Sequence, residues 1–184
     1  MSSNTFPKAR RGTKGYDPVQ VEDFLDDAKR AYSAPAGTPA VLTAKQIRAT
    51  AFPLRAGGYS TEHVDAALER LEDAFAERER ETALALVGEN QWYSSVRSLA
   101  QEILDRSARP PKQKFKRVSA FTRGYHLRDV DDFCGRIVDY FQSGLPLSPD
   151  EVRRASFRVV RGGYQEQQVD AVLDAVIEVM LAVR

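Results

Sequence analysis

One short motif occurs four times in this chain of 184 residues. In each copy a Gly-Tyr pair is followed, five residues after the Tyr, by a Val and then an acidic residue. The Gly-Tyr pairs are Gly15-Tyr16, Gly58-Tyr59, Gly124-Tyr125 and Gly163-Tyr164, and the paired residues after them are Val21-Glu22, Val64-Asp65, Val130-Asp131 and Val169-Asp170. Fixed internal spacing indicates one structural element used repeatedly, and such elements bury their apolar faces against one another. The pattern therefore favours a binding or scaffolding protein over an enzyme.

The copies alternate between two versions, which indicates that a module of two copies has been duplicated. In the second and fourth copies Phe52 and Phe157 stand seven residues before the Tyr, whereas in the first and third copies Phe6 and Phe115 stand ten residues before it. We therefore expect a first repeat pair over residues 1–76, a helical connector over 77–111 and a second repeat pair over 112–184.

Apolar spacing predicts helices and no strand of useful length. Val64, Leu68, Leu71 and Phe75 alternate by four and three residues, as in a coiled-coil seam. The same spacing returns from Trp92 to a stop at Pro110-Pro111, with a kink expected at Gly88. We expect an all-α fold, in which short-helix, loop and long-helix repeats form two small bundles joined by a long helix.

Local signals fix several helix starts. Asp17 before Pro18 is a favourable N-cap. Thr43 with Gln46, and Ser148 with Glu151, match a capping box that begins a short helix.

The residues of the motif have structural explanations. The Gly before each Tyr supplies either a positive φ or room for a neighbouring backbone. The Tyr buries its ring at a helix entrance, and its hydroxyl stays hydrated or hydrogen-bonded. The acidic residue after Val sits in the first helical turn, where the helix dipole favours a negative charge.

We find no pattern typical of an active site, a cofactor site or a metal site. His63 and His126 stand at different offsets from their tyrosines, and neither has metal-ligand spacing to Cys134. Cys134 occupies an apolar repeat position, which predicts a small core residue. The net charge of +1 gives no overall attraction to nucleic acid, and the N-terminal residues contain no apolar run long enough for a signal peptide or a membrane span. We expect a cytoplasmic protein that is not an enzyme.

The four copies of the motif resemble the N-terminal domain of the DivIVA family. The pattern of that family reads roughly Leu-Thr-x-x-x-Ile, a Phe, a Gly-Tyr, and Val-Asp/Asn-x-Phe-Leu. The second copy matches through Leu42, Ile47 and Leu68, and the fourth through Leu147, Val152 and Leu173, besides the motif residues already named. The resemblance implies a cytoplasmic bacterial scaffold of cell division or polar growth, which dimerises and recruits partners at curved membrane. Since two copies occur in each half, we expect the copies to pair within the chain.

In that family an exposed Phe followed by Arg, just before the Gly-Tyr, contacts the membrane. This chain departs from the pattern, since only the third copy has a similar pair, Phe121 with Arg123. Basic residues remain near both loops. They contribute at most about 1 kcal/mol each at an anionic surface, and the alternative interpretation is that they are solvated loop charges. The candidate contacts with membrane or a protein partner are Lys8, Arg10, Arg11, Lys14, Lys112, Lys114, Lys116, Arg117, Phe121, Arg123, Trp92 and Tyr93.

Two further interpretations stay open. The chain is alternatively a purely soluble interaction module that modulates a longer DivIVA filament without binding lipid. Nucleic-acid binding by the basic loops is disfavoured, because acidic helices surround them and no aromatic platform accompanies them.

Overall fold

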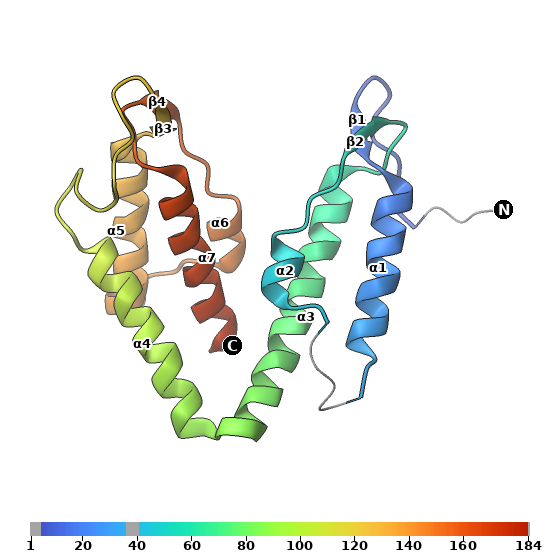
Figure 1. The fold of residues 1–184 in the computed structure, drawn as a ribbon, viewed down its shortest axis with the longest axis horizontal. Coiled ribbons are helices and arrows are strands. Elements are labelled where there is room, and N and C mark those ends of the chain that lie inside the picture. Colours follow the sequence, from blue (N-terminus) through green and yellow to red (C-terminus); the bar gives the residue numbers. More distant parts are fainter. Residues whose placement is uncertain (1–4, 36–40, 184) are drawn as a thin grey trace. The chain divides into compact units, whose positions relative to one another are not determined.

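The computed structural model describes residues 5–35 and 41–183, which form two compact units divided between Ala83 and Leu84 (Figure 1). Unit 1 contains β1 (Lys14–Tyr16), α1 (Pro18–Tyr32), α2 (Ala44–Arg48), β2 (Leu54–Ala56) and most of α3 (Thr61–Val87). Unit 2 contains α4 (Glu89–Ser107), β3 (Arg123–Tyr125), α5 (Leu127–Ser143), α6 (Pro149–Arg153), β4 (Val159–Arg161) and α7 (Glu166–Ala182).

The same order of five elements occurs in both units: strand, helix, short helix, strand, long helix. Each of the five begins at the same distance from its motif tyrosine in unit 1 as in unit 2. The described part of unit 1 has no counterpart of α4.

The fold is largely helical, as the apolar spacing predicts, but each unit also holds a pair of three-residue strands that the sequence analysis did not predict. β1 pairs antiparallel with β2, and β3 pairs antiparallel with β4. Three residues are too few to show the alternation by which a strand is recognised in a sequence. Each pair joins segments some forty residues apart, so no local turn signal marks it either.

Local sequence explains the helix starts. Asp17 caps α1 by accepting a hydrogen bond from the amide of Val19, and Pro18 occupies the first turn. The capping boxes predicted at Thr43 and Ser148 are confirmed, because in each the hydroxyl accepts from the third helical amide while the Gln or Glu side chain accepts from the cap amide.

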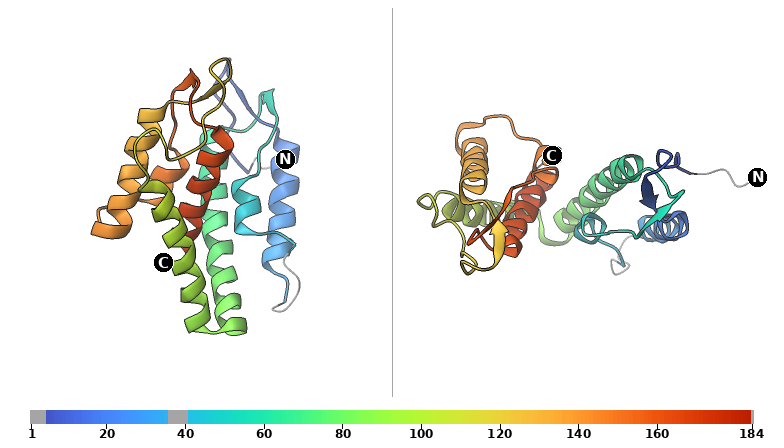
Figure 2. Two further views of the ribbon diagram at one scale, coloured as in Figure 1. Left: turned by 60° about the vertical axis from the view of Figure 1, so that its left-hand side comes forward. Right: turned by 90° about the horizontal axis from the view of Figure 1, so that it is seen from above.

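The predicted connector covers the end of α3, Gly88 and α4. Gly88 adopts a φ of 80°, which ends one helix and begins the next. α4 ends at Ser107, before the two prolines, and it packs against α5 and α7 of unit 2 (Figure 2). Ile103 and Ser107 of α4 are buried there, so α4 belongs to the body of unit 2.

Each unit has its own apolar core, and the motif residues lie in it. The valine of every copy is at most 1% exposed, and Tyr59 and Tyr164 are fully buried. Cys134 is 3% exposed, which confirms its prediction as a core residue. Phe52 and Phe157 each stack edge-on or tilted between a motif tyrosine and a phenylalanine of the first helix.

Candidate interaction site

The four copies meet in pairs at one end of each unit, and the motif tyrosines are the point where two chain segments cross. In unit 1 the amide of Tyr16 donates to the carbonyl of Tyr59 at 2.9 Å, and the amide of Tyr59 donates back at 2.8 Å. Tyr125 and Tyr164 make the same reciprocal pair in unit 2, at 3.0 and 2.8 Å. The first copy is therefore bonded to the second, and the third copy to the fourth.

The glycine before each tyrosine lets these two backbones approach closely. A Cβ on Gly15 would lie 2.1 Å from the carbonyl oxygen of Tyr59, and one on Gly124 would lie 2.2 Å from that of Tyr164. Neither glycine has a positive φ. Of the two explanations offered by the sequence, the need for room is therefore the correct one, and positive φ falls instead on the neighbouring Gly57 and Gly162.

The tyrosine hydroxyls bind the acidic residues of the opposite copy. Tyr59 donates to Glu22, and Tyr164 donates to Asp131 at 2.9 Å. Burial, together with these carboxylates, raises the pKa of both tyrosines. The pKa of Tyr16 is raised by burial and by the nearby carboxylate of Asp65.

The fourth pair, Tyr125 with Asp170, shows the same effects, and burial raises the pKa of Asp170 as well. The interpretation of these acids as first-turn charges was wrong, because each stands at the fifth position of its helix, and the first-turn acids of α3, α5 and α7 are Glu62, Asp129 and Glu166. Each one lies beside the tyrosine of the other copy, which makes the motif a reciprocal clasp.

The basic residues predicted in unit 1 lie at or near its crossing. One of them contacts a motif tyrosine, and the others are exposed to solvent. Lys8 places its Nζ 4.5 Å from the centroid of the Tyr59 ring, a cation–π contact. Arg10, Arg11 and Lys14 are exposed on the loop and on β1. No exposed aromatic side chain accompanies them in the described part of this loop.

The corresponding end of unit 2 combines charge with an exposed aromatic ring. Phe121 is 90% exposed in the turn before β3, and Arg123 lies directly opposite Arg161 across the β3–β4 pair. Arg117 donates through its Nε to the carbonyl of Gly162 at 3.0 Å, which fixes it at the same turn. We call Arg117, Phe121, Arg123 and Arg161 the basic end of unit 2.

Arg161 could not be predicted as a site residue from the sequence, because only the register of the strands places it against Arg123. Two like charges directly opposite each other destabilise an antiparallel pair. Within the described residues neither of these arginines has a carboxylate partner. Such a pair is a site where an external anion would relieve repulsion.

Three other predicted contact residues lie elsewhere in unit 2. Lys114 is 7% exposed and its Nζ donates to the carbonyls of Ser107 and Arg109, so it caps α4 and is not a surface charge; its assignment to the basic loop was wrong. Lys116 is exposed, and its backbone bonds to the beginning of α7. Trp92 lies on α4, partly buried, far along the chain from the basic end.

Tyr93 and Lys112 complete the predicted contacts. Tyr93, beside Trp92 on α4, is 37% exposed. Lys112 is exposed, and its amide donates to Asp131 at 2.8 Å, next to the clasp of unit 2.

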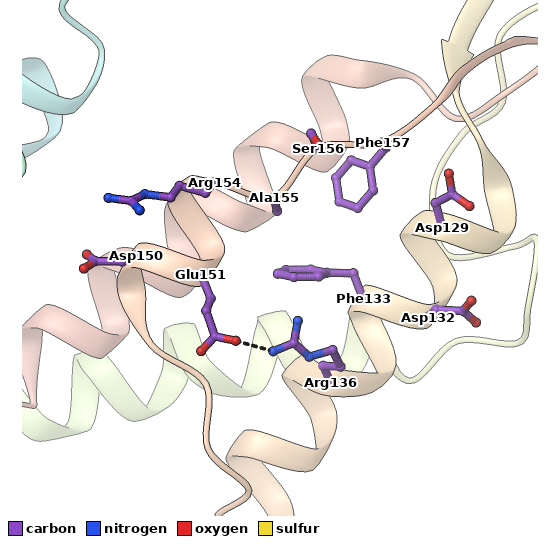
Figure 3. Close-up of a pocket in the computed structure, with 10 residues that line it drawn as sticks. All are labelled: Asp129, Asp132, Phe133, Arg136, Asp150, Glu151, Arg154, Ala155, Ser156 and Phe157. Atoms are coloured by element: carbon purple, nitrogen blue, oxygen red, sulfur yellow. Dashed lines mark hydrogen bonds and ion pairs between the residues drawn. The ribbon is translucent and has the colours of Figure 1, made fainter. Parts of the chain in front are cut away.

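Unit 2 also contains an open pocket of about 610 Å³ between α5 and α6, shown in Figure 3. Its floor is the edge-to-face pair of Phe133 and Phe157, 5.8 Å apart, and Arg136 spans the pocket to reach Glu151 at 2.6 Å. Asp129 at one side is held by Arg158, whose hydrogen bonds hold the pKa of this carboxyl far below its ordinary value. Arg136 and Glu151 pair with each other, whereas Asp150 pairs with Arg153 outside the lining, and no histidine or cysteine lines the pocket.

Among residues 5–35 and 41–183, no three His, Cys, Asp or Glu side chains gather as metal ligands would, and no helix is both long and apolar enough to cross a membrane. His63 pairs with Ser60, and His126 pairs with Asp129.

The interaction surface best supported by these observations is the basic end of unit 2. Comparison of the chain with models of protein families, with curated proteins and with solved structures found no match in any of the three.

Proposed function

We propose that this protein is a non-enzymatic, cytoplasmic adaptor of the DivIVA type, which attaches weakly and reversibly to anionic membrane through the basic end of unit 2. The observation that carries the proposal is Phe121, 90% exposed in a turn beside two arginines that lack carboxylate partners within the described residues. An apolar ring among cations suits the boundary between lipid headgroups and acyl chains.

The expected strength of attachment follows from these groups. Each arginine contributes about 1 kcal/mol near an anionic leaflet. Transfer of a phenylalanine side chain out of water contributes about 1.5–3 kcal/mol. The total, on the order of 5 kcal/mol, corresponds to weak binding that several copies of the chain on one surface would strengthen.

The clasp supports the adaptor part of the proposal. Tyr59 and Tyr164 are hydrogen-bonded to carboxylates across the crossing, and an arrangement that joins the two copies in this way supports a structural role.

Vesicle flotation tests the proposal. The full chain should float with vesicles of phosphatidylglycerol and phosphatidylcholine at low salt, and remain unbound with phosphatidylcholine alone or at high salt, because surface attraction is screened within a Debye length. Phe121→Ala should weaken flotation. Leu54→Ala, which shortens a 54% exposed side chain on β2 of unit 1, is the matched control and should leave flotation unchanged.

The alternative is a purely soluble interaction module, as stated from the sequence. Equal recovery of the wild-type chain in the unbound fraction with both kinds of vesicle would reject the membrane contact and favour that module.

A further inference from the structure

The two units differ in one respect that bears on partner binding: α4 covers one flank of the α5–α7 pair in unit 2, and unit 1 has no such helix among its described residues. Since the other elements correspond one to one, each residue that α4 covers has a counterpart in unit 1. The exposure of these counterparts shows how far the same flank of unit 1 is open to solvent in the absence of a covering helix.

Helical spacing identifies the flank. α2 lies on the side of α3 that carries Glu72, because Arg48 of α2 binds Glu72 at 2.9 Å. In unit 2 the residue at that position of α7 is Ile177, so α6 occupies the corresponding side. Successive residues of a helix are rotated by about 100° around its axis. Val176 and Val179 are therefore rotated by about 100° and 160° from Ile177, and they lie together on another side of α7. We assign them to the flank that α4 covers.

On α5 the corresponding residue is Cys134. The side chain of Ser107 on α4 lies close enough to the Cys134 thiol to affect its pKa, which places Cys134 under that helix. Cys134, Val176 and Val179 are all at most 3% exposed. The flank of unit 2 is therefore apolar and fully covered.

The counterparts in unit 1 are more exposed at each position. Leu25, Leu71 and Ala74, which correspond to Cys134, Val176 and Val179, are only partly buried. Tyr32 is 45% exposed, whereas Phe141 at its position in α5 is partly buried. Lys29 is exposed where unit 2 has the half-buried Val138.

From this comparison we infer that the α1–α3 flank of unit 1, formed by Leu25, Lys29, Tyr32, Leu71 and Ala74, is a docking site for an amphipathic helix of a protein partner. The occupant has the character of α4: apolar residues four and three apart, as in Trp92, Val96, Leu99 and Ile103. An acidic residue beside that stripe would face Lys29, which has no ion-pair partner among the described residues. This inference extends the adaptor role and does not depend on the membrane contact.

The dimensions of the flank limit the partner. From Leu25 to Tyr32 is two helical turns, about 10 Å along α1. At the far end Arg78 lies over the Tyr32 ring at 5.3 Å and donates to the carbonyls at the end of α1, which closes the flank with a fixed cation. A helix of about three turns, with its acidic side toward Lys29, fits these limits.

The probe is a fluorescently labelled peptide of residues 89–107, the α4 sequence itself, titrated into the unlabelled full chain without lipid. Fluorescence anisotropy should show saturable binding that Leu71→Glu weakens at least ~10-fold, which corresponds to about 1.4 kcal/mol. Leu86→Glu is the matched control, because Leu86 is 79% exposed at the end of α3 in unit 2, and it should leave binding unchanged. Phe121→Ala should also leave it unchanged, which separates this test from that of the membrane contact.

A second variant keeps the test valid if Leu71→Glu unfolds unit 1. Lys29→Glu changes an exposed side chain only, and it should weaken binding several-fold at low salt and less at high salt. Absence of saturable binding, or equal binding by all variants, would overturn the inference. Dimerisation of the chain that Leu71→Glu abolishes would assign the flank to a second copy and would also overturn it.

Discussion

Adding one methyl group to Gly124 should disrupt unit 2, because this residue lies where two backbones cross. The Cβ of alanine would be 2.2 Å from the carbonyl oxygen of Tyr164 and 3.0 Å from its carbon. Both are backbone atoms, so no side-chain rotation relieves the overlap. The backbones would have to separate by about 1 Å, given that non-bonded atoms settle at roughly 3.5 Å.

The cost follows from the bonds that this separation breaks. The amides of Tyr125 and Tyr164 bond each other's carbonyls at 3.0 and 2.8 Å, and each such bond contributes about 1 kcal/mol net. Strain from overpacking adds about 1–3 kcal/mol. We therefore expect Gly124→Ala to lower the free energy of unfolding of unit 2 by about 3–5 kcal/mol, a large part of the stability of a domain of this size.

Gly135→Ala is the matched control for this experiment. Gly135 lies inside α5, no atom is within 4 Å of the position of its absent Cβ, and its φ is ordinary. Alanine there should raise stability by about 0.5–1 kcal/mol, because it restricts the unfolded chain without a clash.

Urea unfolding followed by far-UV circular dichroism measures both changes. A change of up to 0.5 kcal/mol in the free energy of unfolding is typical of neutral surface substitutions. If the free energy of unfolding of Gly124→Ala lay within that range of the wild-type value, the close crossing of the two copies would be refuted.

Four further predictions concern the clasp, the core and the pairing of the copies within one chain. Tyr164→Phe removes the hydroxyl that binds Asp131 and should cost about 1–3 kcal/mol in urea unfolding, whereas Tyr93→Phe on the surface of α4 should cost nothing measurable. Burial raises the folded-state pKa of Tyr164 above its ordinary value of 10.0. The protonated hydroxyl therefore makes its full contribution to the free energy of unfolding below pH 10, and this contribution is lost as the pH rises further. The urea midpoint should decrease above pH 10, and it should decrease less steeply in Tyr164→Phe. Cys134, with a pKa raised by burial to about 11, should react with a thiol reagent at neutral pH only after unfolding, and fast labelling of the native chain would contradict its position in the core. If the copies pair within one chain, sedimentation equilibrium at low micromolar concentration should give 20.6 kDa, and obligate dimers would count against that pairing.

Sequence reasoning succeeded where the signal is local. The capping boxes at Thr43 and Ser148 depend on residues three apart, and the burial of Val130 and Cys134 follows from helical spacing, so both could be predicted. The clasp could not be predicted in this way. It joins Tyr164 to Asp131, which are far apart in the sequence and are brought together only by the fold. For the same reason the opposition of Arg123 to Arg161 was missed.

Lys114 shows a different limit. From composition it belongs to a basic loop, yet its ammonium group lies over the end of α4 and is almost fully buried. The negative end of a helix attracts cations, but nothing in the sequence indicates which of several neighbouring lysines will reach it.

The proposed contact between Phe121 and anionic membrane is tested most directly by the environment of that side chain. We would replace Phe121 with Trp in a Trp92→Phe background, so that the chain contains a single tryptophan, and record its emission with added vesicles. With vesicles of phosphatidylglycerol and phosphatidylcholine the emission should shift to the blue and become less accessible to acrylamide, and with phosphatidylcholine alone it should stay that of a hydrated indole. An unchanged, fully quenchable emission in the presence of anionic vesicles would contradict the proposed contact.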